Sequence, residues 1–449
     1  MASLKNWARS LPERHGRTTL ILLAAILVLG FGLRAYRVVE PLGTPGDDAR
    51  AYFALSKSLY EEGSYGGPGF EDASDWSPGA PLLYAGSFYA TGGAREGTAR
   101  IVELLAGLAA ILIVYLLGKR INCRPAGLLA AFGVAIYPSF IHSTGALFSE
   151  PPAIFTLPAA VLAFLWASDQ KHLRAWLLPG FLFGLTALIR PEYLFVGLAF
   201  AALTAIKLWQ ESGWRPGLTG GSLLLGALLV AVAPWAIRNQ IVLDRTTLST
   251  GGGKALYVGT FLPADGEYER VKAQLVKRYQ GRSLEPGSEA LDRVNPTPLF
   301  DRVAERYPDL ERDEALGKIG KQNFSKYFGE DPVGYGAMTV RKVWRMWSAG
   351  IGEAMSSTLG RVLQVLLVLL GIVGMGVLAA RRRWWELVAM ATPIVLVTGV
   401  GALSLAAPRR NEILMTLVFP LAGTALAWGA AALSSNRPWP SRQASSPQS

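Results

Sequence analysis

The chain has 449 residues, of which 51% are hydrophobic and 17% charged, and its formal net charge is +11. Soluble domains carry roughly 25% charged residues, so this composition excludes an ordinary soluble protein and indicates a membrane protein. The single cysteine, Cys123, excludes a disulfide and a thiolate metal site. No basic stripe with interleaved aromatic residues accompanies the positive charge, which excludes nucleic-acid binding.

The apolar residues gather into ten runs, each close to the ~20 residues that cross the ~30 Å hydrocarbon layer of a bilayer. Each run predicts a membrane-spanning helix, and the Gly and Pro residues inside several runs are typical of such helices. The first run is too long, and lacks the small-residue cleavage site, for a signal peptide, so we expect it to remain as an anchor. The runs lie near residues 19–38, 99–118, 125–142, 150–167, 173–189, 191–208, 218–237, 358–380, 386–405 and 411–434.

The loop charges orient these spans, because Lys and Arg close to helix ends stay on the cytoplasmic side. The N-terminus, the tail and every second loop together hold 16 basic and 4 acidic residues, whereas residues 39–98 hold 3 basic and 9 acidic residues. Both termini and Cys123 are therefore predicted to be cytoplasmic, and residues 39–98 and 239–357 to lie outside. The positive net charge is then largely a signal of topology.

The spans and loops together predict five segments. The long loop 39–98 contains a helical pattern whose Ala51, Leu55, Ser58 and Leu59 share one face, which predicts an amphipathic helix in the membrane interface. Residues 239–357, with 17 basic and 16 acidic residues, predict a small helical domain that caps the outer surface. The segments are a cytoplasmic N-terminus (1–18), a module of seven spans that includes the first outer loop (19–238), the outer domain (239–357), a module of three spans (358–434) and a disordered cytoplasmic tail (435–449).

Ionisable residues at the predicted span ends gather at the outer boundary, from six separate stretches of chain. A single boundary charge often only anchors its helix at the headgroups. Acids mixed with arginines, on the side that should be poor in arginine, favour a functional site instead. These residues are Asp47, Asp48, His142, Glu150, Arg190, Glu192, Arg238, Arg409, Arg410 and Glu412.

Two pairs among them have a chemistry of their own. Asp47 and Asp48 follow a Gly-Thr-Pro-Gly turn and open a predicted helix, where a carboxylate serves either as a helix cap or as a general base for an attacking hydroxyl. Arg190 and Arg238 each stand where a span meets the outer surface, which is the depth of a lipid phosphate. Each arginine either holds a specific phosphate through forked hydrogen bonds or reaches ordinary lipid headgroups.

Six stretches occur in the order GDDARAYFALSKSLYEEG, SPGAPLLYA, LFSEPPAIF, LIRPEYLF, PWAIRNQIVLDRTTLSTGGGKALYVGTF and RRNEILMTLVFPLAG. With these the chain resembles the GT-C glycosyltransferases of family 39, the protein O-mannosyltransferase and aminoarabinose transferase type. The resemblance implies an all-helical polytopic bundle of about ten spans. It also implies a polyprenyl-phosphate-sugar donor, transfer to an acceptor hydroxyl at the outer face, and inversion at the anomeric carbon.

The resemblance also implies roles for residues. Asp47 matches the catalytic base of the family, Asp48 stands where the family often has Glu, and Arg50 is expected to face the donor phosphate. Many relatives have Lys or Arg where Trp76 and Ser77 stand here, so phosphate binding is expected to depend on Arg50, Arg190 and Arg238. The full set of substrate-binding candidates is Arg50, His142, Glu150, Arg190, Glu192, Arg238 and Tyr257.

Neither the sugar nor the acceptor is indicated by a motif, and a glycan, a lipid and a protein hydroxyl all stay open. No cofactor is expected; a divalent metal is possible but no cluster of metal ligands indicates one. A transporter or flippase of lipid-linked sugars is an alternative, disfavoured because the charges crowd one face and no repeat is visible. A ligase for a preassembled lipid-linked glycan is a second alternative. The absence of retention and targeting signals favours a bacterial plasma membrane.

Overall fold

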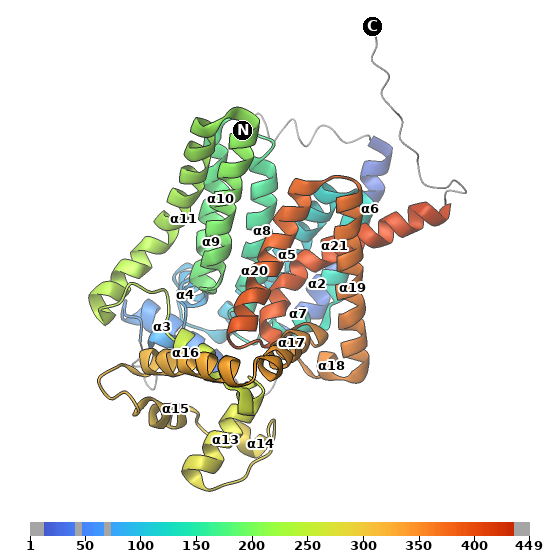
Figure 1. Ribbon diagram of the computed structural model, residues 1–449. Coiled ribbons are helices and arrows are strands. Elements are labelled where there is room, and N and C mark those ends of the chain that lie inside the picture. Colours follow the sequence, from blue (N-terminus) through green and yellow to red (C-terminus); the bar gives the residue numbers. More distant parts are fainter. Residues whose placement is uncertain (1–12, 41–46, 67–72, 435–449) are drawn as a thin grey trace.

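The computed structural model describes residues 13–40, 47–66 and 73–434, and within these ranges every regular element is a helix (Figure 1). Eight of the helices are long and apolar enough to cross a membrane. The predictions of an all-helical fold and of an integral membrane protein are confirmed. The eight helices are α2 (Glu13–Val39), α5 (Glu96–Ile121), α8 (Glu150–Ala167), α10 (Tyr193–Ser212), α11 (Trp214–Leu243), α19 (Thr358–Ala380), α20 (Trp384–Leu403) and α21 (Pro408–Ser434).

The remaining two predicted spans are shorter in the structure. The run 125–142 forms two helices, α6 (Arg124–Ile136) and α7 (Pro138–Ser143), because the extended Tyr137 before Pro138 ends the first of them. The 13 residues of α6 rise about 20 Å, which is less than the ~30 Å of a hydrocarbon layer. The run 173–189 forms the 3-10 turn η2 (Leu173–Trp176) followed by α9 (Leu177–Ile189).

Helices α8 and α21 lie at the centre of the bundle. In their spanning segments 78% and 72% of the residues are buried. Phe419 of α21 packs edge-on against Tyr137, with ring centroids 5.3 Å apart. Beside them α5 and α6 approach so closely that a Cβ on Gly118 would lie 2.8 Å from the Cα of Gly127, so glycine is required there. The two central helices both begin at the same end of the bundle, where the polar residues gather.

The loop between α2 and α5, predicted to be the first outer loop, contributes two helices to that end, α3 (Asp47–Glu61) and α4 (Gly79–Thr91), with the turn η1 (Ala73–Asp75) between them. The predicted apolar face of α3 exists, since Ala51, Leu55 and Ser58 are all buried. It packs on protein, however, because Leu55 clusters with Tyr65 and with Trp235 of α11. This contact corrects the expectation that the apolar face of α3 lies on the membrane interface.

A helical layer with a core of its own covers the same end of the bundle, as Figure 1 shows. We call it the outer layer. Its core joins Val258, Leu275, Phe300 and Leu316. Its helices are α12 (Gly252–Thr260), η3 (Leu262–Ala264), α13 (Tyr268–Gln280), α14 (Glu289–Asp292), α15 (Thr297–Ala304), α16 (Arg312–Glu330), α17 (Pro332–Ser348) and α18 (Glu353–Ser356). Asp75 of the first outer loop ties the two outer parts together by accepting hydrogen bonds from Thr250 Oγ1 and from the Arg312 guanidinium, both at 2.8 Å.

Candidate functional site

Carboxylates and arginines from four separate parts of the chain gather at the covered end of the bundle. Helix α3 supplies Asp48 from its first turn, and α8 supplies Glu150 as its first residue. The link between α9 and α10 supplies Arg190 and Glu192, and the first turns of α21 supply the remaining three. The polar cluster, as we define it, consists of Asp48, Glu150, Arg190, Glu192, Arg409, Arg410 and Glu412.

Glu150 is the centre of this polar cluster and is fully buried. Its two carboxylate oxygens accept hydrogen bonds from Arg409, at 2.7 Å from Nε and 3.1 Å from Nη2. Arg190 donates a third hydrogen bond, from Nη2 at 3.3 Å. A buried carboxylate that receives a forked guanidinium is among the strongest charge-assisted contacts in proteins, so Glu150 fixes the orientation of Arg409.

The outward edge of Arg409 contacts Asp48. The Arg409 Nη1 donates to Asp48 Oδ2 at 2.5 Å, and both side chains are partly exposed. The guanidinium also lies over the ring of Phe148, 4.8 Å from its centroid, a favourable position for a cation. Arg409 therefore has one permanently buried carboxylate partner and one partner at the accessible edge of the polar cluster.

The link between α9 and α10 extends the polar cluster. The Nε of Arg190 lies 3.8 Å from Glu192 Oε1, within ion-pair distance. Nearby, Tyr52 of α3 is buried. Burial, which is the larger cause, and the negative charge of Asp48, which is a smaller one, raise the pKa of its hydroxyl to about 12. Tyr52 is therefore a neutral hydroxyl beside the charged groups, able to donate or accept a hydrogen bond.

Glu412 is the unusual member of the polar cluster. Its side chain is fully buried, and neither carboxylate oxygen has a hydrogen-bond partner among the described residues. A buried polar group without a partner is expensive to keep in a folded protein. Glu412, which the sequence placed only at the predicted outer boundary, is therefore a candidate for a specific role in the site.

The loop that precedes Glu150 is held by another buried carboxylate, Glu103 of α5. Its oxygens accept hydrogen bonds from the backbone amides of Gly145, Leu147 and Phe148, at 2.7, 3.3 and 2.9 Å. The hydroxyl of Tyr84 donates a fourth, at 2.8 Å. These contacts fix the loop that leads into α8, so Glu103 positions both Phe148 and Glu150 beneath Arg409.

Asp47 and Arg50 belong to the same helix as Asp48. Asp47 is the first residue of α3, and its side chain lies outside the described part of the structure. Arg50 is exposed one turn further along. The backbone of α3 thus brings the predicted acidic pair to the edge of the polar cluster.

Three sequence-predicted candidates lie elsewhere. His142 lies in α7 against the loop at Gly352, where a Cβ would come within 2.6 Å of its Nδ1. Arg238 lies beside Trp235, 5.2 Å from the ring centroid, and donates to the carbonyl oxygen of Tyr65 at 3.4 Å. Tyr257 is buried in the core of the outer layer. In the described chain none of the three makes an ion pair or hydrogen bond with the polar cluster.

The sequence reasoning placed Arg409, Arg410 and Glu412 at the outer boundary but did not select them as site residues. The available signal was a Pro-Arg-Arg-Asn-Glu stretch opening the last span, because charges at the start of a central helix must be paired. No local signal marked Tyr52 or Glu103. Among the described residues no group of three His, Cys, Asp or Glu side chains is arranged to hold a metal ion.

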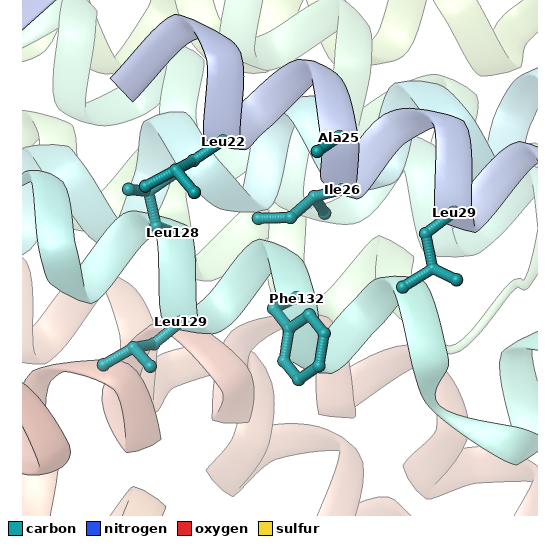
Figure 2. Close-up of a pocket in the computed structure, with 7 residues that line it drawn as sticks. All are labelled: Leu22, Ala25, Ile26, Leu29, Leu128, Leu129 and Phe132. Atoms are coloured by element: carbon teal, nitrogen blue, oxygen red, sulfur yellow. The ribbon is translucent and has the colours of Figure 1, made fainter. Parts of the chain in front are cut away.

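Two pockets in the structure lie outside the polar cluster. Figure 2 shows an apolar groove of about 370 Å³ between α2 and α6, lined by Leu22, Ala25, Ile26, Leu29, Leu128, Leu129 and Phe132. It offers no polar group for chemistry. A second pocket of about 550 Å³ lies between α12 and α16 in the outer layer and includes Gly253, Asp313 and Lys318. The carboxylate of Asp313 is already engaged by the backbone amides of Gly253 and Lys254.

Comparison with known proteins bears on the fold of the chain. Residues 75–237 match the family described as dolichyl-phosphate-mannose-protein mannosyltransferase. The structure of the archaeal oligosaccharyltransferase AglB from Archaeoglobus fulgidus, in complex with an inhibitory peptide and a dolichol-phosphate, superimposes with a TM-score of 0.55 at 14% identity, over 96% of this chain and 53% of AglB. This chain has the GT-C glycosyltransferase fold. The GT-C fold implied by the six stretches is thereby confirmed, and this chain spans about half the length of AglB.

Two further solved structures also match this chain. The same archaeal enzyme, tethered to an acceptor peptide containing the NVT sequon, matches with a TM-score of 0.53 at 14% identity, over 92% of this chain and 50% of that one. ArnT from Cupriavidus metallidurans bound to undecaprenyl phosphate is 12% identical over 92% of this chain and 78% of ArnT. Its TM-score of 0.40 is too low to establish a shared fold by itself. No curated protein matches the chain by sequence.

Proposed function

We propose that this protein is an inverting glycosyltransferase that moves a sugar from a polyprenyl-phosphate-linked donor to an acceptor hydroxyl at the outer face of the membrane. The GT-C fold and the family match over residues 75–237 support the reaction class. The polar cluster supplies the chemistry at the covered end of the bundle. The observation that carries the proposal is the position of Arg409, which has a buried partner in Glu150 and an accessible partner in Asp48.

Arg409 is suited to hold the donor phosphate. Glu150 occupies its inner side in a fully buried contact, so the guanidinium keeps its orientation when other partners change. Asp48, at the accessible edge, occupies the Nη1 donor that a phosphate oxygen would take. Guanidinium groups bind phosphate through forked, charge-assisted hydrogen bonds. The donor phosphate then displaces the Asp48 carboxylate from Arg409, and the inner pair stays intact.

The reaction is a single displacement. Asp47 accepts the proton of the acceptor hydroxyl while the acceptor oxygen forms its bond to the anomeric carbon. The bond between the anomeric carbon and the phosphate oxygen breaks, and the electron pair leaves with the polyprenyl phosphate. Attack from the face opposite the phosphate inverts the configuration. Arginine charge around the departing phosphate stabilises the transition state, as preorganised donors do where negative charge develops.

The other arginines have supporting roles in this proposal. Arg190 acts through Glu150, since its guanidinium contacts that carboxylate and Glu192. Arg50, exposed on α3, approaches the donor from the first outer loop. Arg238, beside Trp235 and Tyr65, lies at the border of the loop and contributes to a more distant part of the donor. Removing Arg190 or Arg238 is accordingly expected to weaken donor use, and removing both to weaken it further.

The charges at the opposite end of the bundle support the proposed sidedness. There Arg120 pairs with Asp169 at 2.9 Å and with Glu386 at 3.1 Å, and Arg383 donates to the carbonyl oxygen of Ile121 at 2.6 Å. This basic end is the cytoplasmic one by the charge rule for membrane proteins, so the polar cluster faces outward. We place the protein in a bacterial plasma membrane with both termini in the cytoplasm and residues 239–357 outside, where they help to select the acceptor.

Asp48 makes the proposal testable by donor binding. Asp48→Asn removes the carboxylate that competes for Arg409, so polyprenyl phosphate in detergent micelles is expected to bind this variant several-fold more tightly. Arg409→Lys keeps one charge but loses the fork, and is expected to bind it at least tenfold more weakly. Arg293→Ala, which removes an exposed arginine of the outer layer, is the control and should bind as the wild type does. Unchanged affinity in both cluster variants would contradict a phosphate site at Arg409.

Transfer of a preassembled glycan is the second candidate, and the fold shared with an oligosaccharyltransferase favours it. The two candidates differ in the size of the donor. Membranes that contain the protein are supplied with a radiolabelled polyprenyl-phosphate monosaccharide or with a polyprenyl-linked oligosaccharide. Consumption of the monosaccharide donor alone supports the first function, and consumption of the oligosaccharide donor alone supports the second.

A further inference from the structure

Helix α17 of the outer layer has two apolar sides. One side is buried and carries Tyr335, Met338 and Met346. The opposite side carries Val333, Val340 and Trp344, which are spaced by seven and four residues and so lie in one stripe at 100° per residue. These three side chains are 81%, 70% and 60% exposed. We refer to this stripe as the outward face of α17.

The buried side also carries a basic residue, Lys342, which is fully buried. Its ammonium donates to the carbonyl oxygens of Gly259 and Ala402, at 2.7 and 2.9 Å. Both carbonyls belong to the last turns of their helices, α12 and α20, where a cation is favourable. A helix that buries its lysine and exposes valine and tryptophan has the reverse of the pattern expected against water.

The level of α17 relative to the membrane-spanning helices explains why this helix exposes valine and tryptophan and buries its lysine. Trp347 Nε1 donates to Thr398 Oγ1 of α20 at 3.1 Å. Thr398 precedes the end of that span at Leu403 by five residues, a rise of about 7.5 Å. On the other side, Asn411 of α21 donates to the carbonyl oxygen of Ala349 at 2.9 Å. Figure 1 likewise shows α17 crossing the ends of these spans. Helix α17 is therefore level with the outer ends of α20 and α21.

The outward face of α17 lies beside an exposed apolar side of the spanning helix α20. Val395, one turn before Thr398 and within a spanning helix, is 64% exposed. A large apolar side chain exposed inside a span has acyl chains as its surroundings. Trp347 lies about 60° around its helix from Trp344, so the contact with Thr398 brings the outward face next to the same surface.

We propose that the outward face of α17 lies in the outer leaflet of the bilayer, with Val333 and Val340 among acyl chains and Trp344 at the headgroup level. An interfacial helix buries its apolar side at the boundary between headgroups and chains, and tryptophan is enriched at that depth. The partner is the lipid surface itself. The choice of the outer leaflet rests on the sidedness proposed above, whereas the contact with lipid rests on the exposure and depth of α17 alone.

The assignment gives α17 a mechanical role. Its inner side is bonded through Lys342 to α12 and α20, and its end is bonded through Asn411 to α21. Asn411 follows Arg409 and Arg410 in the same helix. The lipid contact of α17 therefore holds the outer layer at a fixed height above the first turns of α21, where the polar cluster lies.

Site-directed spin labelling tests this inference. The single native cysteine is removed as Cys123→Ser, and one new cysteine is introduced as Val333→Cys, Val340→Cys or Trp344→Cys in full-length protein in lipid nanodiscs. Val395→Cys serves as the lipid-facing control. Arg293→Cys, at an exposed position of the outer layer, serves as the water-facing control. All five positions are exposed, so the variants should elute as the parent protein does.

The measurement is the relaxation of each label by oxygen, which concentrates in lipid, and by a water-soluble nickel chelate. Labels at 333 and 340 are expected to be relaxed several-fold more by oxygen than by the chelate, as at 395, and the label at 344 should give an oxygen-to-chelate ratio between those at 395 and 293. Stronger relaxation by the chelate, as at 293, would overturn the proposal, since the face would contact water. Weak relaxation by both reagents would also overturn it, because another protein surface would then cover the face.

Discussion

Arg409 and Glu150 form a forked ion pair at the centre of the polar cluster, although 259 residues separate them in the chain. The pair joins the first turns of α8 and α21, the two most buried spans. Because the carboxylate is fully buried, the guanidinium orientation is fixed before any substrate binds. The pair therefore links the stability of the bundle to the geometry of the site.

Replacing Glu150 by Gln tests that link. The change keeps the shape but leaves Arg409 without its buried countercharge, and breaking a buried ion pair typically costs about 3–5 kcal/mol. We expect a lower free energy of unfolding of about this size in detergent, together with loss of sugar transfer. Glu289→Gln, which removes an exposed partner of Arg293, is the matched control. Equal stability of the two variants would show that the central pair contributes nothing to the fold.

The orientation of the protein is tested at Cys123, which lies between α5 and α6 at the end opposite the polar cluster. In intact cells a membrane-impermeant maleimide is expected to leave Cys123 unlabelled, and permeabilised cells should show labelling. An Arg293→Cys variant should be labelled in intact cells. If Cys123 reacts before permeabilisation, the polar cluster faces the cytoplasm and the outward assignment fails.

The contact between Asp75 and Arg312 is expected to couple the first outer loop to the outer layer. A double-mutant cycle with Asp75→Ala and Arg312→Ala should give a coupling free energy of about 1 kcal/mol in unfolding measurements, as for residues in direct contact. The same cycle on the exposed pair Arg293 and Glu289 should give at most a few tenths of a kcal/mol. A coupling near zero at Asp75 would mean that the outer layer does not restrain the loop that carries Asp47.

Asp265 is expected to make the stability of the outer layer depend on pH in the acid range. Burial alone would raise the pKa of this carboxyl, but hydrogen bonds from Arg341 and Arg345 outweigh burial and hold the pKa below its usual value. A pKa that is lower in the folded than in the unfolded state increases the free energy of unfolding. This contribution is complete above the ordinary carboxyl pKa of about 3.9 and is lost as the pH falls through the pKa of the folded state. Thermal unfolding of Asp265→Asn should lose this part of the acid dependence. An acid profile identical to that of the wild type would contradict the assignment.

The sequence was sufficient for the fold because each predicted span depends on a local property, the length of an apolar run. The two runs that formed shorter helices differ for local reasons as well, and Pro138 explains one of them. Asp48, Glu150, Arg190 and Glu192 could be placed at one boundary because topology follows from loop charge. The pairing of Arg409 with Glu150 could not be predicted, since it depends on which spans are neighbours in the bundle.

The candidates that lie outside the polar cluster have a similar explanation. Tyr257 lies in a stretch that resembles the family, but its ring fills the core of the outer layer beside Phe261 and Phe300. A buried aromatic residue and a ligand-binding one have the same sequence signature. The burial of Lys342 could not be predicted either. Nothing in its neighbourhood in the sequence distinguishes a lysine that caps two helix ends from one exposed to water.

The central claim is that Asp47, at the start of α3, is the general base for sugar transfer. Adjacent residues of a helix point about 100° apart, so only one of Asp47 and Asp48 can reach the acceptor proton. Asp48 faces Arg409, on the side proposed for the donor phosphate, so we assign the acceptor side to Asp47. The decisive measurement is the rate of transfer from a radiolabelled polyprenyl-phosphate monosaccharide in membranes matched for protein amount. Asp47→Asn should lower turnover by about 10²-fold or more, the usual contribution of a general base, with donor binding retained, and Asp48→Asn should lower it less. Wild-type turnover in Asp47→Asn would contradict the account, whether or not Asp48→Asn is active.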